Sequence, residues 1–195
     1  PNSFQDYSLH AQRINNSGNK LWSNSNITVQ SGLGTTINQS IAKNEDGDLL
    51  IIWQLGHTGI PNSMDIYVQK INSNGAVQWS LNGLPVCLTT AFNILGPKII
   101  SDQKGGAIIC WNDNRNDLSK SDIYTQRISS NGTPLWSANG IPVCIKVGSQ
   151  GTKHIFSDNN GGAIIFWEDN QEPTYFIYGQ RIDSTGNILW EPDGR

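Results

Sequence analysis

Three short apolar runs, each ending in a tryptophan, dominate the hydrophobic pattern of the chain. They cover residues 48–53, 106–111 and 162–167, and a group of turn-forming residues precedes each of them. An unbroken run of this length is typical of a strand that is buried on both faces. Residues 122–129 alternate instead, with odd and even side chains on opposite faces and neither set wholly polar, which predicts a second kind of strand.

This pattern predicts an all-β protein. The expected strands lie near residues 48–54, 65–72, 98–102, 106–112, 122–129, 154–158, 162–168 and 176–183. The pair Asn131-Gly132 predicts a tight hairpin turn, and Asn139-Gly140 predicts a kink or bulge in the strand that follows. Residues 44–48 lack the spaced acidic ligands of a calcium loop and are interpreted as another hairpin turn. No stretch carries a helical period of 3.6, so we expect no helix longer than two turns.

The same succession of segments recurs at nearly constant spacing. An alternating strand, a glycine turn and a tryptophan occur together four times, and successive tryptophans are 57, 57 and 54 residues apart. These tryptophans are Trp22, Trp79, Trp136 and Trp190. Four antiparallel strands per unit, repeated with a period of this size, are typical of β-propeller blades. A β-helix would have shorter rungs, and a β-sandwich would not repeat so regularly.

We therefore expect residues 1–195 to form part of a single β-propeller repeat domain, built of four-stranded antiparallel blades. The approximate units are 1–30, which is partial, 31–88, 89–145 and 146–195, or about three and a half blades. The first unit lacks its inner strands, and a half blade leaves an exposed sheet edge that natural proteins avoid. The sequence thus predicts further repeats of the same parent chain beside these residues.

Two resemblances follow from the repeat motifs. Residues 183–190, Asp-Ser-Thr-Gly-Asn-Ile-Leu-Trp, resemble the tryptophan-docking motif of quinoprotein-type propeller blades, although the turn is one residue shorter. The cofactor-binding residues of those enzymes have no counterpart here, so no cofactor is expected. The signature W-x-D-x-R, D-I-Y-x-Q-R-I, N-G-x-x-x-W and N-G-x-P-V is similar, over essentially the whole chain, to uncharacterised repeats of large secreted or surface proteins of bacteria. This second resemblance implies an exported protein and no known reaction.

The connections predict how a blade is oriented. Tight turns join the first strand of a unit to the second and the third to the fourth, so these turns share one side of the disc. The loops between the second and third strands and the links between units share the opposite side, which we call the loop face. The link 88–96 is long enough to run from the outer edge of one blade to the centre of the next, which places the first strand innermost.

Most of the recurring side chains are interpreted as structural. A large aromatic residue buries about 200 Å² and locks one sheet to the next, so the seven tryptophans are expected to be structural. The polar residues that recur in the third strand are expected to bond between sheets, since buried polar groups must be satisfied. They are Gln69, Gln126, Gln180, Lys70, Arg127 and Arg181. The three cysteines are Cys87, Cys110 and Cys144, and we expect buried, unpaired thiols, because equivalent positions in adjacent repeats lie too far apart for a disulfide.

Composition narrows the range of partners. Only 15% of the residues are charged and the formal net charge is -3, so there is no basic field that would hold nucleic acid. No run of about 18 apolar residues occurs, and no membrane span is expected. Residues 1–4 lack the basic and apolar parts of a signal peptide, as they also would in a processed product.

Candidate contact residues lie where the units differ. The loops between second and third strands cover residues 55–63, 113–121 and 169–175, and recognition concentrates on loops that a rigid scaffold carries. The candidates on these loops and on a link between units are His57, Phe92, Asp113, Arg115, Asp169, Glu172 and Tyr175. Asp113 and Asp169 occupy the same repeat position, which favours a loop-capping side chain over a general acid.

Three functions compete at this point. The sequence contains no G-x-S-x-G, no H-E-x-x-H and no glycine-rich phosphate loop, so it predicts no catalytic residue, and no metal site is expected. The first hypothesis is a non-enzymatic scaffold of an exported bacterial protein, secreted or on the cell surface, that binds a protein or glycan ligand on its loop face in interaction or adhesion. The second is a lectin-like propeller with Phe92, Tyr175 and Phe176 as sugar platforms. The third is a hydrolase or lyase acting on glycans.

Overall fold

The described part of the chain folds into antiparallel strands joined by turns and loops. The computed structural model describes residues 7–22, 25–32, 34–56, 64–88, 93–171 and 173–195, and these ranges contain no helix, which confirms the all-β prediction. In chain order the strands are β1 (Leu9–Ala11), β2 (Ile27–Gln30), β3 (Thr35–Lys43), β4 (Leu49–Gly56), β5 (Met64–Ile71), β6 (Leu84–Cys87), β7 (Ile94–Ser101), β8 (Ala107–Asp113), β9 (Asp122–Ile128), β10 (Ile141–Cys144), β11 (Ser149–Ser157), β12 (Ala163–Gln171) and β13 (Thr174–Ile182).

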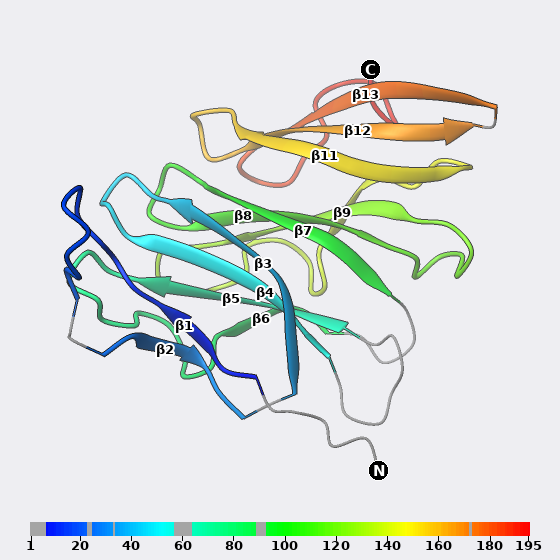
Figure 1. Ribbon diagram of the computed structural model, residues 1–195. Helices are drawn as coiled ribbons and strands as arrows, with labels where there is room; N and C mark the ends of the chain where they lie inside the picture. The colour runs from blue at the N-terminus through cyan, green and yellow to red at the C-terminus, as the bar shows by residue number, and fades with distance from the viewer. Residues whose placement is uncertain (1–6, 23–24, 33, 57–63, 89–92, 172) are drawn as a thin grey trace, which may run out of the picture.

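The strands form four sheets that stack in chain order (Figure 1). β1 and β2 make a half blade, β3–β6 make blade 1, β7–β10 make blade 2, and β11–β13 make blade 3. Gly179 of β13 and Arg195 exchange two backbone hydrogen bonds of 2.9 Å, so a fourth strand begins to pair in blade 3 as well. The chain therefore forms about three and a half four-stranded blades of a β-propeller.

The first strands of successive blades lie next to one another. β3 contacts β7, and β7 contacts β11, while the fourth strands of blades 1 and 2 lie at the opposite edges of their sheets (Figure 1). This is the arrangement expected for innermost first strands. Residues 44–48 form the predicted hairpin turn between β3 and β4, in which the Gly47 N–H donates to the Asn44 carbonyl over 3.2 Å.

Three apolar cores lie between the stacked sheets. One fills the space between the half blade and blade 1, one lies between blades 1 and 2, and one lies between blades 2 and 3. All seven residues of β8 and all seven of β9 are buried, because blade 2 is covered on both faces. This double burial explains why the sequence shows unbroken apolar runs rather than alternation with a clean polar face.

The tryptophans hold the blades together, as predicted. Trp53, Trp111 and Trp167 are fully buried, and Trp79 and Trp136 are 8% exposed. The indole N–H of Trp79 donates over 3.2 Å to the carbonyl of Ser130, which lies in the hairpin turn of the next blade. Trp22 and Trp136 make the same bond to the corresponding serines, at 3.1 and 3.4 Å.

Two recurring cations, Lys70 and Arg127, cross between blades, whereas Arg181 pairs with Asp158 of its own blade and the recurring glutamines also bond within their own blades. Lys70 donates over 2.7 Å to the carbonyl of Ser130 in blade 2, and Arg127 donates over 2.8 Å to that of Ser184 in blade 3. The prediction that the glutamines bond between sheets was wrong. Gln126 accepts from the Trp136 backbone N–H of its own unit over 3.0 Å, and Gln69 and Gln180 do the same. The backbone N–H beside the turn needs an acceptor on the same sheet, and the glutamine side chain supplies it.

The three thiols are buried and unpaired, as predicted. Burial in the apolar cores raises the pKa of Cys87 and of Cys110 to about 12 and that of Cys144 to about 11. These thiols are therefore protonated at neutral pH and act as small hydrophobic residues. Among the described residues we find no helix long and apolar enough to span a membrane.

The sequence misplaced one connection. Residues 169–175 were expected to form a loop, but β12 continues to Gln171 and β13 begins at Thr174, where the two residues pair directly. Blade 3 therefore carries an extended hairpin in place of a folded loop. The sequence did not predict these strand residues because the stretch is polar. Side chains need not be apolar where the hairpin extends beyond the core.

Candidate functional site

The loop of residues 114–121 in blade 2 is the most elaborate connection on the described part of the loop face. It has its own hydrogen bonds, in which the Asn114 amide donates to the Leu118 carbonyl over 2.8 Å and the Lys120 N–H donates to the Asp117 carbonyl over 3.0 Å. The Ser119 N–H donates to the Asp117 carboxylate over 2.9 Å. These bonds give the loop one defined shape before any ligand arrives.

Arg115 anchors the loop to the blade. Its guanidinium donates to the Asp113 carboxylate over 2.9 Å from Nε and lies 3.8 Å above the centre of the Tyr124 ring. It also donates to the Asn139 carbonyl over 3.0 Å. Asp113 is buried, and it accepts a bond of 3.0 Å from the indole of Trp111. These two predicted contact residues thus support the loop from below, and Asp113 acts as the loop-capping side chain that its repeat position favoured.

Asp122 fixes the other end of the loop. Its carboxylate accepts a hydrogen bond of 2.7 Å from the Asn116 amide, which also donates to the Tyr124 hydroxyl over 2.9 Å. Burial raises the pKa of Asp122 above its usual value, the hydrogen bond from Asn116 opposes this, and the neighbouring carboxylate of Asp113 adds to the rise. Asp113 and Asp122 are paired directly across β8 and β9.

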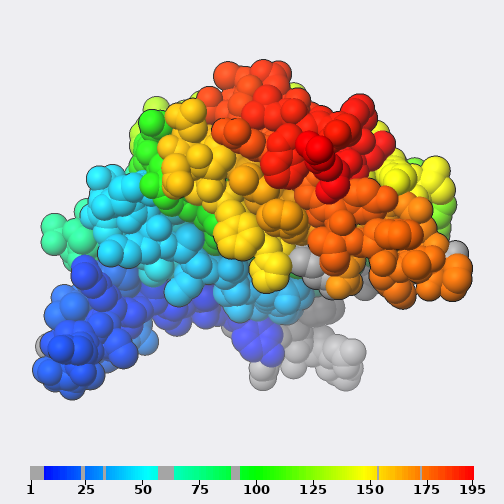
Figure 2. Space-filling model, turned by 90° about the horizontal axis from the view of Figure 1, so that it is seen from above, coloured from blue at the N-terminus to red at the C-terminus, as the bar shows by residue number. Residues whose placement is uncertain are grey.

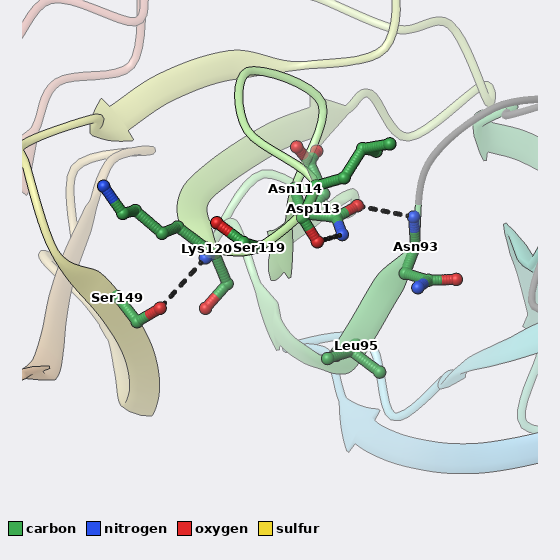
Figure 3. A pocket seen from close by; sticks show the side chains of 9 residues that line it. Asn93, Leu95, Asp113, Asn114, Ser119, Lys120 and Ser149 are labelled. Carbon is green, nitrogen blue, oxygen red and sulfur yellow. Dashed lines mark hydrogen bonds between the residues drawn. The ribbon is translucent and has the colours of Figure 1, made fainter.

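A pocket of about 210 Å³ opens beside this loop (Figure 3). Residues from β7, from the loop and from the start of β11 line it: Asn93, Leu95, Asp113, Asn114, Leu118, Ser119, Lys120, Ser121 and Ser149. Figure 3 shows Asn93 and Leu95 on one side and Ser149 on the other. The Asn93 N–H donates to the Asn114 side chain over 2.7 Å, and the Ser121 N–H donates to the Ser149 hydroxyl over 3.3 Å. We call this the blade 2 pocket.

A second pocket of about 180 Å³ adjoins the first. Its lining is Ser121, Ser149, Gln150, Gly151, Glu168, Asn170 and Tyr175, so Ser121 and Ser149 are common to both pockets. We call it the blade 3 pocket. The predicted contact residue Tyr175 is 66% exposed and lies on its rim. Asp169 is buried instead, where it accepts bonds from Gln150 and Gln171 over 3.1 and 2.7 Å.

The remaining predicted contact residues are not placed. His57, Phe92 and Glu172 lie outside the described residues. In the part of the chain that the structure describes, no group of three or more His, Cys, Asp or Glu side chains could hold a metal ion. The residues that the sequence analysis missed are Asn93, Asn114, Ser121, Ser149 and Asn170. Serine and asparagine occur throughout the chain, so the sequence does not single out these five residues. Only their position around the two adjoining pockets distinguishes them.

Comparison with known proteins supports the fold. No family model matches the chain, and no curated protein matches its sequence. Among solved structures, a thermostable family-43 glycoside hydrolase is 15% identical, with a TM-score of 0.51 over 97% of this chain and 73% of that chain. The endo-arabinase of Bacteroides thetaiotaomicron VPI-5482 is also 15% identical, with a TM-score of 0.42 over 82% of this chain, which spans only 58% of the arabinase. At this identity the likeness to the family-43 structure shows the β-propeller fold alone.

Proposed function

We propose that this chain is a non-enzymatic propeller scaffold of an exported bacterial protein, secreted or on the cell surface, that binds a protein or glycan ligand on its loop face in interaction or adhesion. The observation that carries the proposal is the difference between recurring and non-recurring residues. Recurring glutamines, cations and tryptophans are used for contacts within and between blades. The non-recurring loop 114–121 instead forms one wall of a preformed pocket. A shaped pocket on loops held by a rigid scaffold is the usual arrangement of a binding module.

Hydrolysis of a glycan is the competing proposal, since a glycoside hydrolase shares the fold. Such enzymes place two carboxyl groups about 5 to 9.5 Å apart on either side of the scissile bond. The two carboxylates with the same repeat position, Asp113 and Asp169, are buried and bonded within their own blades. Asp122 accepts from Asn116 and supports the loop. These roles favour binding over bond cleavage.

Further repeats of the same parent chain are proposed as partners of blade 3. Figure 2 looks down on β11–β13, drawn from yellow to red, whose outward face no other described sheet covers. Phe156 and Ile177 on this face are 54% and 66% exposed. Their repeat equivalents in blade 2, Ile100 and Ile123, belong to the core beneath blade 3. The outward face therefore has the composition of a blade interface.

An array of immobilised proteins and glycans tests the proposed function. The fluorescently labelled chain is compared with the loop-face variant Leu95→Asp/Leu118→Asp, which places charge on two exposed apolar residues of the blade 2 pocket. Leu81→Asp is the matched control, since Leu81 is 86% exposed and lies outside both pockets. We expect the control to bind like the original chain and the loop-face variant to lose most of the signal.

Two results would contradict the proposal. One is equal binding by the loop-face variant and the original chain, which would show that the loop face is not the binding surface. The other is the appearance of new reducing ends when the chain is incubated with a panel of polysaccharides, which would establish hydrolysis.

A further inference from the structure

The two loop-face pockets occupy partly equivalent positions in successive blades. Four of the seven residues that line the blade 3 pocket stand one repeat after a residue of the blade 2 pocket. The equivalent pairs are Asn93 and Ser149, Leu95 and Gly151, Asn114 and Asn170, and Ser121 and Tyr175. Ser121 and Ser149 line both pockets, so the two pockets adjoin where blade 2 meets blade 3, and we call the pair of pockets the groove. A groove that repeats with the blades fits a ligand that is itself a polymer.

The lining of the groove is polar with little net charge. Amide and hydroxyl groups predominate, and the Lys120 ammonium of the blade 2 pocket lies 3.6 Å from the Asp117 carboxylate. Asp113 and Glu168 are among the lining residues, and the Asp113 carboxylate is buried and paired with Arg115. Since the lining has no excess of cations, it offers nothing to an anionic polymer such as nucleic acid or a phosphorylated chain, whereas an uncharged ligand with many hydroxyl groups would find both donors and acceptors.

One acceptor in the blade 3 pocket lacks a donor. In blade 2, the side-chain oxygen of Asn114 accepts from the Asn93 N–H over 2.7 Å. The equivalent oxygen, Oδ1 of Asn170, is buried and has no hydrogen-bond partner among the described residues. A buried acceptor without a donor is unfavourable, so such atoms are normally satisfied by protein, water or ligand. A ligand hydroxyl would supply that donor once the Asn170 side chain, which lines the pocket, turns its oxygen toward it.

An exposed aromatic ring stands beside this acceptor. Tyr175 is 66% exposed and pairs directly with Asn170 across β12 and β13, on the same face of β13 as Ile177 but at the end of the hairpin that extends beyond the core. A tyrosine at the rim offers an apolar face and a polar hydroxyl, which suits a ligand with an apolar C–H face and polar edges. Sugar rings have both. The neighbouring Phe176 points to the opposite face of the strand, where its ring lies 6.3 Å from that of Tyr178, so it is not part of the groove.

We propose that this groove binds a neutral polysaccharide, with each blade pocket taking part of the sugar chain and Tyr175 and Asn170 holding one ring. The proposal rests on the proposed function, because it names the ligand class of the same loop face. It differs from a protein ligand in one measurable way. Binding must strengthen with the length of the saccharide until both pockets are filled, since the second contact becomes intramolecular.

The test uses the whole chain labelled with ¹⁵N and titrated with cellohexaose, xylohexaose and maltohexaose, together with the three trisaccharides. We expect amide shifts at Ser121 and Ser149 with at least one hexasaccharide, and binding about tenfold tighter than that of its trisaccharide. Tyr175→Ala and Asn170→Ala should each weaken that binding about tenfold. Phe156→Ala is the matched control, since it removes an exposed aromatic residue from blade 3 outside the groove and should change nothing.

Each contrary outcome is decisive. Unchanged spectra with all three hexasaccharides at about 5 mM would overturn the saccharide proposal. So would affinity that is independent of length, or equal loss of binding in Phe156→Ala and Tyr175→Ala. If the array shows protein ligands that depend on the loop face, the proposed function stands while the saccharide proposal fails. If the array signal ignores the loop-face substitutions, the proposed function itself fails.

Discussion

At the scale of single residues, the glycine beneath each second-strand tryptophan has no room for a side chain. Gly140 has a φ of 84° and lies against Trp111, so that an added Cβ would stand 2.5 Å from Trp111 Cη2 and 2.8 Å from the Thr125 carbonyl oxygen. The carbonyl belongs to the ladder of β9 and cannot move away easily. Glycine is needed here for both conformation and space.

Gly140→Ala should therefore lower the free energy of unfolding by about 3 kcal/mol or more, from the left-handed strain together with the clash. Gly18→Ala is the matched control, because Gly18 has a φ of 79° but nothing within 4 Å of the added Cβ. That variant should lose only about 1 kcal/mol. Urea denaturation of both variants measures the difference, and equal losses would show that the tryptophan contact contributes nothing.

Asp122 gives a pH-dependent prediction. Its pKa is raised in the folded chain above the usual value of 3.8 by burial and by Asp113. Because the folded chain holds the proton of Asp122 more tightly than the unfolded chain does, protonation of Asp122 stabilises the fold. This contribution is fully present below the pKa that Asp122 has in the unfolded chain, and it is lost as pH rises through the pKa that it has in the folded chain. Asp122→Asn should thus be at least as stable as the original chain at pH 7, and its advantage should shrink as pH falls toward 3.8. Thermal melts across this range check the sign, and a variant that is relatively most stable at low pH would contradict it.

At the scale of strands and sheets, buried ion pairs connect the first hairpin turn to the third strand. In blade 2, Arg127 lies 2.8 Å from Asp102, with side chains 10% and 0% exposed. In blade 3, the same pair is Arg181 and Asp158 at 3.0 Å, but Arg181 is 38% exposed. The same bond therefore occurs in two environments within one chain.

Arg127→Met should cost about 3 to 5 kcal/mol, because it leaves the Asp102 carboxylate buried without its cation. Arg181→Met is the comparison variant and should cost less than Arg127→Met, since solvent reaches the Arg181 guanidinium, which is 38% exposed, and screens the pair. The double variant Arg127→Met/Asp102→Asn should lose less free energy of unfolding than the two single variants lose when their losses are added. Equal costs in the two blades would show that burial does not control the strength of this pair.

The elements also show what a sequence can predict. The strands β8 and β9 and the buried tryptophans followed from unbroken apolar runs and a fixed period, both of which reflect burial on two faces. The hairpin of β12 and β13 could not be predicted past Asp169, because its tip leaves the core and its composition is that of a loop. The pocket residues Ser149 and Asn170 could not be predicted either. They line a pocket only because two blades lie side by side, and the residues next to them in the sequence give no sign of that arrangement.

At the scale of the whole molecule, blade 2 belongs to two cores at once. Cys87 lies in the core between blades 1 and 2, while Cys110 and Cys144 lie in the core between blades 2 and 3. Both cores share the strands of blade 2, so loss of one should expose the other. The thiols report on this coupling because all three are buried.

Thiol labelling at pH 8 should therefore be very slow in the native chain, since a pKa of about 12 leaves about one Cys87 thiol in ten thousand ionised and a pKa of about 11 leaves about one Cys144 thiol in a thousand. We expect two single-cysteine variants, retaining Cys87 or Cys144, to become reactive at the same urea concentration. The measurement is the rate of reaction with a disulfide reagent across the denaturant range. Two separate midpoints would show that the cores open independently.

The hydrogen bonds from Trp22, Trp79 and Trp136 to a serine of the following blade have a consequence for the gene. Donor and acceptor belong to successive copies of one motif, so any copy that carries the motif can follow any other. Unequal crossing-over between two copies would remove or add a whole blade, and the newly joined neighbours would present the same serine carbonyl, glycine and apolar face to each other. An array of such units can change its number of blades without evolving a new interface, while each loop on the loop face is free to diverge by itself.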